Sequence, residues 1–239
     1  MAKTVMIIIV IMVFILGIAL GFYLTPKKII EVDNSKEIKQ IIKDIPIVGV
    51  NDKGEGVTGK ITVEMKEGAG LVLVNINDVL ADYNTQLSAR IAAKIASNIT
   101  GIELNNIDLI YNIKANASAI EGASAGSVMA VATIAALQNK NIKPYVYMTG
   151  AIDENGNILQ VGAVKEKSHA AKTANGKLFL IPSAEYVDSY NADKYCTKYK
   201  SYEYCELLFT PRLIDLSNAF GLEVKQVNTV KEAADLILE

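Results

Sequence analysis

The stretch EGASAGSVMAVATIAAL, residues 121–137, decides how this chain is interpreted, because it places Ser124 where a loop of small residues enters an apolar helix. Small flanking residues leave the Ser124 hydroxyl open to a substrate carbonyl. The positive helix end and nearby backbone N–H groups can stabilise an oxyanion, so Gly122, Ala123 and Ala125 form the candidate oxyanion and substrate region. Such runs also occur as flexible loops or tight packing, so this stretch alone leaves a nucleophile as one interpretation.

A serine nucleophile needs a base, and the sequence offers two candidates. His169 is the single histidine, but a surface or capping role fits its helical turn, KSHAA, equally well. A lysine can serve if burial lowers its pKa of ~10.4 by ~2–3 units. In VGAVKEK, residues 161–167, Lys167 lies just inside a helix. If Lys167 points inward while Lys165 points to solvent, Lys167 is the desolvated lysine; a lysine on a solvated helix face is the alternative.

Hydrophobic patterning predicts an α+β domain, in which strands and helices are mixed without strict alternation. Asp78 is predicted to cap a helix whose apolar residues recur every four positions from Val79 to Ile99. Asn155 and Gly156 are predicted to turn a hairpin. Strands are expected at 47–50, 59–66, 70–76, 107–113, 145–148, 151–153, 158–161, 177–181 and 223–227, and helices at 78–97, 124–137, 165–174, 213–220 and 230–238.

The N-terminal segment predicts a single membrane span. Residues 5–24 are 20 consecutive residues without a charge, enough to cross roughly 30 Å of bilayer as a helix. A cleaved signal peptide is the alternative, but its apolar region is usually ~7–15 residues and ends in small residues, whereas this run ends in Phe22, Tyr23 and Leu24. We therefore expect an anchor over residues 1–25, a stalk over 26–45 that ends at Pro46, and one domain over 46–239.

Two features argue against nucleotide and nucleic-acid ligands. Residues 54–61, GEGVTGKI, resemble a phosphate loop, but Ile61 stands where a hydroxyl must hold Mg²⁺, and the following residues alternate as a strand. A glycine-rich turn is the better interpretation, so we predict neither ATP binding nor another cofactor. The net charge of −2 offers no basic excess for nucleic acid.

A polar insertion over residues 183–211 holds six of the eleven tyrosines and both cysteines, Cys196 and Cys205. Tyrosines suit a binding surface, while a self-packed lid or a partner contact is an equal alternative. The cysteine spacing suits a disulfide, which needs an oxidising compartment, and two free thiols remain the alternative. Lysines follow the apolar segment and favour the cytoplasm. We expect the domain outside the cytoplasm on the strength of the cysteines.

Four motifs in order are similar to the proteolytic domain of Lon peptidases. They are GxSAG at Ser124, MTG at Thr149 25 residues later, the hairpin at Asn155 and Gly156, and VGxVKEK ending at Lys167, 43 residues after Ser124. A helix, a strand and Ile-Pro follow, so the resemblance covers residues 75–182 and, more loosely, the terminal strand and helix. It implies a serine endopeptidase in which Ser124 attacks the peptide carbonyl, Lys167 accepts its proton and Thr149 orients Lys167.

The resemblance has departures and further implications. Ala123 stands where the family typically has Pro or Asp, and Ala151 where a Glu often follows MTG. Family members carry an ATP-driven unfolding domain, for which this chain has no room. We therefore expect ATP-independent cleavage of unfolded polypeptides, or an ATPase partner. The family's six-membered ring implies a homo-oligomer. The alternatives are a non-catalytic peptide-binding or scaffold module at the membrane, and a structural protein that docks a partner through the insertion.

Overall fold

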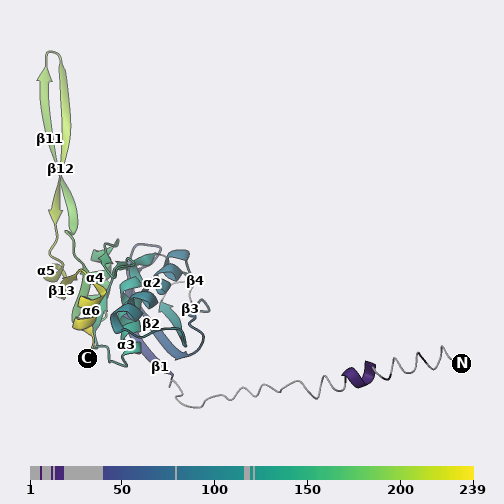
Figure 1. Cartoon of the computed structure of the whole chain (residues 1–239). Helices are drawn as coiled ribbons and strands as arrows, with labels where there is room; N and C mark the ends of the chain where they lie inside the picture. Colours follow the sequence, from purple (N-terminus) through teal and green to yellow (C-terminus); the bar gives the residue numbers. More distant parts are fainter. Residues whose placement is uncertain are drawn as a thin grey trace. The chain divides into compact units, whose positions relative to one another are not determined.

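The computed structural model describes residues 40–78, 80–115, 119–120 and 122–239, together with Met6, Met12 and residues 14–18. The chain divides into Met1–Glu37 and Ile38–Glu239, and the second unit holds the strands and helices of Figure 1 that concern function. Most of the predicted anchor lies outside the described residues, so it stays a prediction. Among the described residues there is no helix with both the length and the apolar character needed to cross a bilayer.

A four-stranded sheet in the order β1-β2-β5-β3 carries the larger core. β1 (Ile41–Val50) pairs antiparallel with β2 (Gly56–Glu67), β2 pairs antiparallel with β5 (Ile107–Ala115), and β3 (Val72–Asn75) runs parallel to β5. Because side chains alternate along a strand, the sheet has two unlike faces. One face buries large apolar side chains, which include Ile45, Ile61, Val63, Leu109 and Tyr111.

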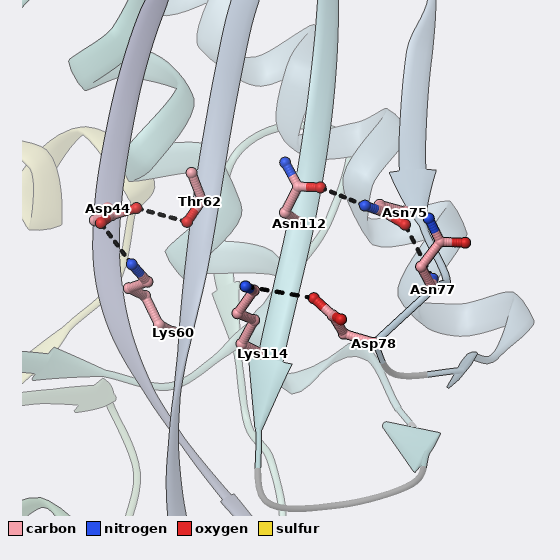
Figure 2. A network of polar contacts seen from close by, with 8 residues as sticks. All are labelled: Asp44, Lys60, Thr62, Asn75, Asn77, Asp78, Asn112 and Lys114. Atoms are coloured by element: carbon pink, nitrogen blue, oxygen red, sulfur yellow. Dashed lines mark hydrogen bonds and ion pairs between the residues drawn. The ribbon is translucent and has the colours of Figure 1, made fainter.

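The other face of this sheet carries polar side chains that bond across the strands (Figure 2). Asp44 on β1 accepts hydrogen bonds from Lys60 Nζ at 2.7 Å and from Thr62 Oγ1 at 2.5 Å, both on β2. Asn112 on β5 accepts a hydrogen bond from Asn75 on β3. Exposed ion pairs contribute at most ~1 kcal/mol each to stability. These polar contacts are therefore compatible with a solvent-exposed face, and the buried apolar face supplies most of the stability of the sheet.

Helices α2 (Tyr83–Thr100) and α3 (Gly126–Leu137) pack together beside the apolar face, and every residue of α3 is buried. The cap of α2 is Asp82, whose side chain accepts from the Thr85 amide at 2.7 Å. The prediction that Asp78 caps this helix is therefore wrong. Asp78 instead pairs with Lys114 at 3.6 Å, and Leu80–Ala81 form strand β4, which pairs with β6 (Ala119–Ile120).

The predicted four-residue apolar stripe of α2 is only partly correct. The buried residues of α2 are mainly small, among them Ser88, Ala92 and Ala96, since α3 is also built of small residues and the two helices approach closely. The bulkier side chains at the N-terminal end of the stripe lie outside this contact, so Tyr83 is 74% exposed and Leu87 38% exposed.

A second, parallel sheet has the order β13-β10-β7. Its strands are β7 (Val146–Met148), β10 (Leu178–Pro182) and β13 (Glu223–Val227). Helices α4 (Val164–Thr173), α5 (Leu216–Phe220) and α6 (Val230–Ile237) accompany it. A second core forms around Phe179, and α4 also packs against β1 and β2. This contact brings the helix that carries Lys167 to the first sheet.

Turns connect the shorter elements as the sequence predicted, and one expected boundary is corrected. Asp153 accepts hydrogen bonds from the amides of Asn155 and Asn157 in the turn between β8 (Ala151–Ile152) and β9 (Ile158–Leu159). The segment 54–61, which resembles a phosphate loop, is a turn that leads into β2: the Gly54 amide donates to the Asn51 carbonyl, and a strand follows in place of a helix. The expected stalk is too long, however, since β1 begins at Ile41 and Pro46 lies within it.

The insertion forms a long hairpin that leads away from the body of the domain in Figure 1. Its strands are β11 (Val187–Tyr199) and β12 (Tyr202–Leu213), so the hairpin ends two residues beyond the predicted insertion. Cys196 and Cys205 lie directly opposite each other in the antiparallel register and are bonded. The disulfide alternative is thus the one found.

Gly56 allows α4 to approach β2, which gives a test of this packing. A methyl group on Gly56 would overlap the backbone carbonyl of Glu166 in α4. Gly56→Ala should therefore destabilise the domain by about 1–3 kcal/mol, as measured by urea denaturation. Gly49→Ala is the matched control, since its methyl group would meet Val57 at 3.9 Å, an ordinary contact. Equal stability of the two variants would contradict the packing of α4 on β2.

Candidate active site

The candidate nucleophile and base line one cavity of about 640 Å³. Its walls come from the end of β1, the β1–β2 turn, the start of β2, the loop before α3 and the loop before α4. Most lining side chains are small or aliphatic, and the charged ones are Asp52 and Lys167. The lining residues include Ile47, Val48, Gly49, Val50, Asn51, Asp52, Val57, Gly122, Ala123, Ser124, Ala125, Ala151, Gln160, Val161, Ala163 and Lys167.

Ser124 lies in a short 3-10 turn, η1 (Ala123–Ala125), which leads directly into α3. The α-helix therefore begins at Gly126 and not at Ser124 as predicted. Gly122 enters the turn with φ of 92°, a conformation that glycine adopts without steric cost. The Gly122 amide donates to Asp82 Oδ2 at 3.1 Å, and its carbonyl accepts from Thr85 Oγ1 at 3.3 Å. The cap of α2 thus fixes the approach to Ser124.

Asp82 holds this loop as a carboxylate. Partial burial acts to raise the pKa of Asp82, but hydrogen bonds from Thr85, Gly122 and Asn84 outweigh it and keep the pKa below its usual value. This role of Asp82 was not predicted, although an Asp three residues before Thr85 is a typical capping pattern. The β1–β2 turn was not predicted as a cavity wall either, because its placement depends on packing between distant segments.

The end of β7 holds the Ser124 turn from the other side. The Gly150 amide donates to the Ser124 carbonyl at 2.9 Å, and Thr149 Oγ1 donates to the same carbonyl at 3.3 Å. The Ser127 amide in turn donates to the Gly150 carbonyl at 3.0 Å. Gly126 keeps this junction tight, because a methyl group there would lie 3.0 Å from Ile152. Residues far apart in the sequence therefore fix the backbone of Ser124.

Lys167 lies in the first turn of α4 and lines the cavity. Only 4% of the residue is exposed, and its Nζ donates to Thr149 Oγ1 at 3.4 Å. Its amide donates to Ala163, which begins the helix at φ of 56°. Burial lowers the pKa of Lys167 from 10.5 to about 8. In the described part of the chain, the ion pairs all involve other lysines, so a nearby carboxylate does not offset this burial.

Two neighbours of Lys167 on α4 differ from it. Lys165 is half-exposed and pairs with Asp188, which raises its pKa through the hydrogen bond and the charge attraction. His169 is exposed and makes an edge-to-face contact with Phe220, with ring centroids 6.1 Å apart. It lines a separate cavity with Gly56 and Thr173. Lys167 thus points inward and Lys165 towards solvent, which is the arrangement that a lysine base requires, and His169 does not line the cavity of Ser124.

Comparison with known families accounts for this arrangement. The C-terminal proteolytic domain of Lon protease (S16) matches residues 40–198. The chain belongs to this Lon family. The match begins one residue before β1 and ends within the hairpin, so it includes every residue that lines the Ser124 cavity.

Individual Lon proteins are similar to parts of the chain. An archaeal Lon protease of Methanocaldococcus jannaschii is 31% identical over 173 residues, which are 66% of this chain and 27% of that protein. Lon protease 1 of Borreliella burgdorferi is 31% identical over 135 residues, 56% of this chain and 15% of that protein. An archaeal Lon protease of Thermoplasma volcanium is 27% identical over 178 residues, which are 65% of this chain and 26% of that protein. The chain thus spans about a quarter or less of these relatives.

The arrangement in this Lon family domain suits proton transfer. A lysine with a pKa of about 8 is partly neutral near physiological pH and can accept a proton, which an exposed lysine cannot do efficiently. Thr149 connects Lys167 to the backbone of Ser124. Among the described residues, no group of three or more His, Cys, Asp or Glu side chains could hold a metal ion.

The burial of Lys167 should cost stability in a pH-dependent way. Between pH 8 and 10.5 the unfolded chain binds the proton that the folded chain has released, so wild-type stability should rise with pH in this window. Lys167→Met removes the buried charge and should stabilise the domain at pH 7 by as much as ~3 kcal/mol. This advantage should shrink towards pH 10.5. Chemical denaturation at several pH values measures it.

Lys165→Met is the control, because Lys165 is half-exposed and paired with Asp188. It should bring no comparable gain at pH 7. A Lys167→Met variant that is as stable as the wild type at every pH would contradict the depressed pKa of Lys167.

Proposed function

We propose that this chain is a serine endopeptidase in which Ser124 is the nucleophile, Lys167 the general base and Thr149 the residue that positions Lys167. The observation that carries the proposal is the buried Lys167, whose Nζ donates to Thr149 while Thr149 donates to the carbonyl of Ser124. A structural lysine would gain stability from a carboxylate partner or from solvent. The membership of the chain in the Lon family supports the same interpretation.

The proposed reaction has two halves. In the first, neutral Lys167 accepts the proton of the Ser124 hydroxyl as Oγ bonds to the peptide carbonyl carbon. The resulting ammonium gives the proton to the leaving amine as the C–N bond breaks. In the second half, neutral Lys167 takes a proton from water as the water oxygen bonds to the acyl carbon. The Lys167 ammonium then returns this proton to Ser124 Oγ as the ester C–O bond breaks, which releases the carboxylic acid and regenerates both residues. Backbone amides of the turn Ala123–Ala125 are the proposed donors to the oxyanion, because the Gly122 amide already donates to Asp82.

The proposed substrate is an unfolded polypeptide or peptide, because the cavity is lined mainly by backbone and small aliphatic side chains. We propose ATP-independent cleavage by this chain, which the turn structure of the Gly54–Lys60 segment supports. Assembly into a homo-oligomer, a hexamer by analogy with the family, and delivery of folded substrates by an ATPase partner are further proposals. A scaffold or peptide-binding role would need neither the buried lysine nor its link to Ser124.

We further propose that residues 5–24 anchor the chain in a membrane and that the domain lies outside the cytoplasm. The apolar run supports the anchor. The bond between Cys196 and Cys205 supports the location, since disulfides persist in oxidising compartments.

Peptide cleavage should depend on both members of the proposed pair. Ser124→Ala and Lys167→Ala should each lower the cleavage of fluorescein-labelled casein by at least ~1,000-fold. Lys167→Arg should be as inactive as Lys167→Ala, because a guanidinium stays protonated at working pH. Wild-type cleavage should proceed without ATP and at the same rate when ATP is added.

Matched controls separate loss of chemistry from loss of folding. Lys165→Ala and His169→Ala lie on the same helix and should keep most of the activity, and circular dichroism should be unchanged in all variants. Substantial activity of Lys167→Arg would exclude Lys167 as the base. An inactive wild type that still binds unfolded casein would favour the peptide-binding module. Stimulation by ATP would contradict the ATP-independent proposal.

The state of the cysteines tests the proposed location. Thiol alkylation of the full chain in its native membranes, without reductant, should leave Cys196 and Cys205 unmodified when the protein is read by mass spectrometry. Both should react after reduction, with a loss of roughly 2–3 kcal/mol of local stability in the hairpin. Two alkylated cysteines before reduction would remove the support for a domain outside the cytoplasm.

A further inference from the structure

The disulfide-bonded hairpin exposes apolar side chains on both of its faces. On the face of the Cys196–Cys205 bond, Tyr190, Leu207 and Phe209 are 62%, 58% and 59% exposed. On the opposite face, Tyr195, Tyr204 and Leu208 are 59%, 65% and 56% exposed. The two strands pack chiefly against each other. A two-stranded hairpin without other support is at best marginally stable in water, and here the Cys196–Cys205 bond joins the strands while their apolar side chains stay exposed.

The area involved is that of a protein interface. Ten hydrophobic or tyrosine side chains of the hairpin are between 40% and 77% exposed. With aromatic side chains of about 150–250 Å² each, they expose roughly 1,000 Å² summed over both faces. A stable interface buries about 800 Å² per partner, so the two faces together offer the area of one side of such an interface.

A second apolar surface lies on the body of the same chain. We call it the 71–87 patch; its members come from the edge strand β3, from β4 and from the start of α2. They are between 38% and 74% exposed and comprise Leu71, Leu73, Ile76, Leu80, Tyr83 and Leu87. It includes the apolar stripe of α2 that the contact with α3 leaves uncovered. An open apolar edge strand is also a surface that proteins normally cover.

Figure 1 shows the hairpin leaving the body on the side away from β3 and β4. At about 3.3 Å per residue, the 13 residues of β11 extend the hairpin away from its own 71–87 patch. One chain therefore presents two different apolar surfaces that it cannot bring together. A head-to-tail contact between identical subunits joins two different surfaces of the chain, and these two apolar surfaces meet that requirement.

We propose that the hairpin is an assembly arm that docks on the 71–87 patch of a second copy of this chain. The proposal rests on the homo-oligomer suggested above and names the surfaces that form it. Lys165 in α4 pairs with Asp188 at the base of the arm. The arm is therefore connected to α4, the helix that carries Lys167.

The oligomeric state of the full chain tests the arm. Sedimentation velocity should show an oligomer for the wild type. Leu207→Asp/Leu208→Asp, which places a charge on each face of the hairpin, should shift it to monomers. Tyr83→Asp should do the same from the other side, and an acidic residue in the first turn of α2 suits the helix dipole, so its fold should persist. Lys198→Asp in the hairpin is the control and should leave the oligomer intact.

Crosslinking identifies the partner surface. A Leu208→Cys chain mixed with a Tyr83→Cys chain should give a dimer with a bismaleimide, while neither variant alone should give one. Crosslinking of Leu208→Cys to itself would overturn the proposal in favour of arm-to-arm pairing. An oligomer that survives the double Asp substitution while casein binding is lost would overturn it in favour of a substrate-binding hairpin. A monomeric wild type would overturn the homo-oligomer itself, while the cleavage assay would still test Ser124 and Lys167.

Discussion

Thr149 connects the two groups on which the proposed chemistry depends. Its hydroxyl accepts a hydrogen bond from Lys167 Nζ and donates one to the carbonyl of Ser124. Both partners are held by their own elements, because η1 and α3 fix Ser124 and α4 fixes Lys167. A buried ammonium is unfavourable unless protein groups solvate it well. The burial that lowers the pKa of Lys167 to about 8 therefore also lowers the stability of the domain.

The rest of the fold brings these elements together. α4 lies close to β2 because Gly56 has no side chain, and the Ser124 turn meets β7 through Gly150 and Gly126. Asp82 ties the preceding loop to α2. The two sheets thus supply different parts of one site: the first forms much of the cavity wall, and the second presents Thr149 at the end of β7. Family membership in Lon fits this division.

The sequence predicted the elements that carry the site more accurately than their surroundings. Spacing and motif order identified Ser124, Thr149 and Lys167 as a group, and the burial of Lys167 followed from its position after an apolar strand. The sequence could not reveal that Asp82 caps α2 in place of Asp78, since either aspartate fits the capping pattern. It also could not show that residues 41–45 join the sheet, because in the sequence IIKDI the adjacent Lys43 and Asp44 break the apolar alternation expected of a strand.

The pH dependence of Ser124 reactivity tests the central claim most directly, because it reports the base without requiring a substrate. The rate at which a fluorophosphonate labels the full chain would be measured from pH 6 to 10, with Ser124→Ala as the blank. The account predicts a rate that rises with pH around a midpoint near 8, the pKa of Lys167, and that is lost in Lys167→Met. Labelling of Ser124 with the same midpoint in Lys167→Met would contradict it.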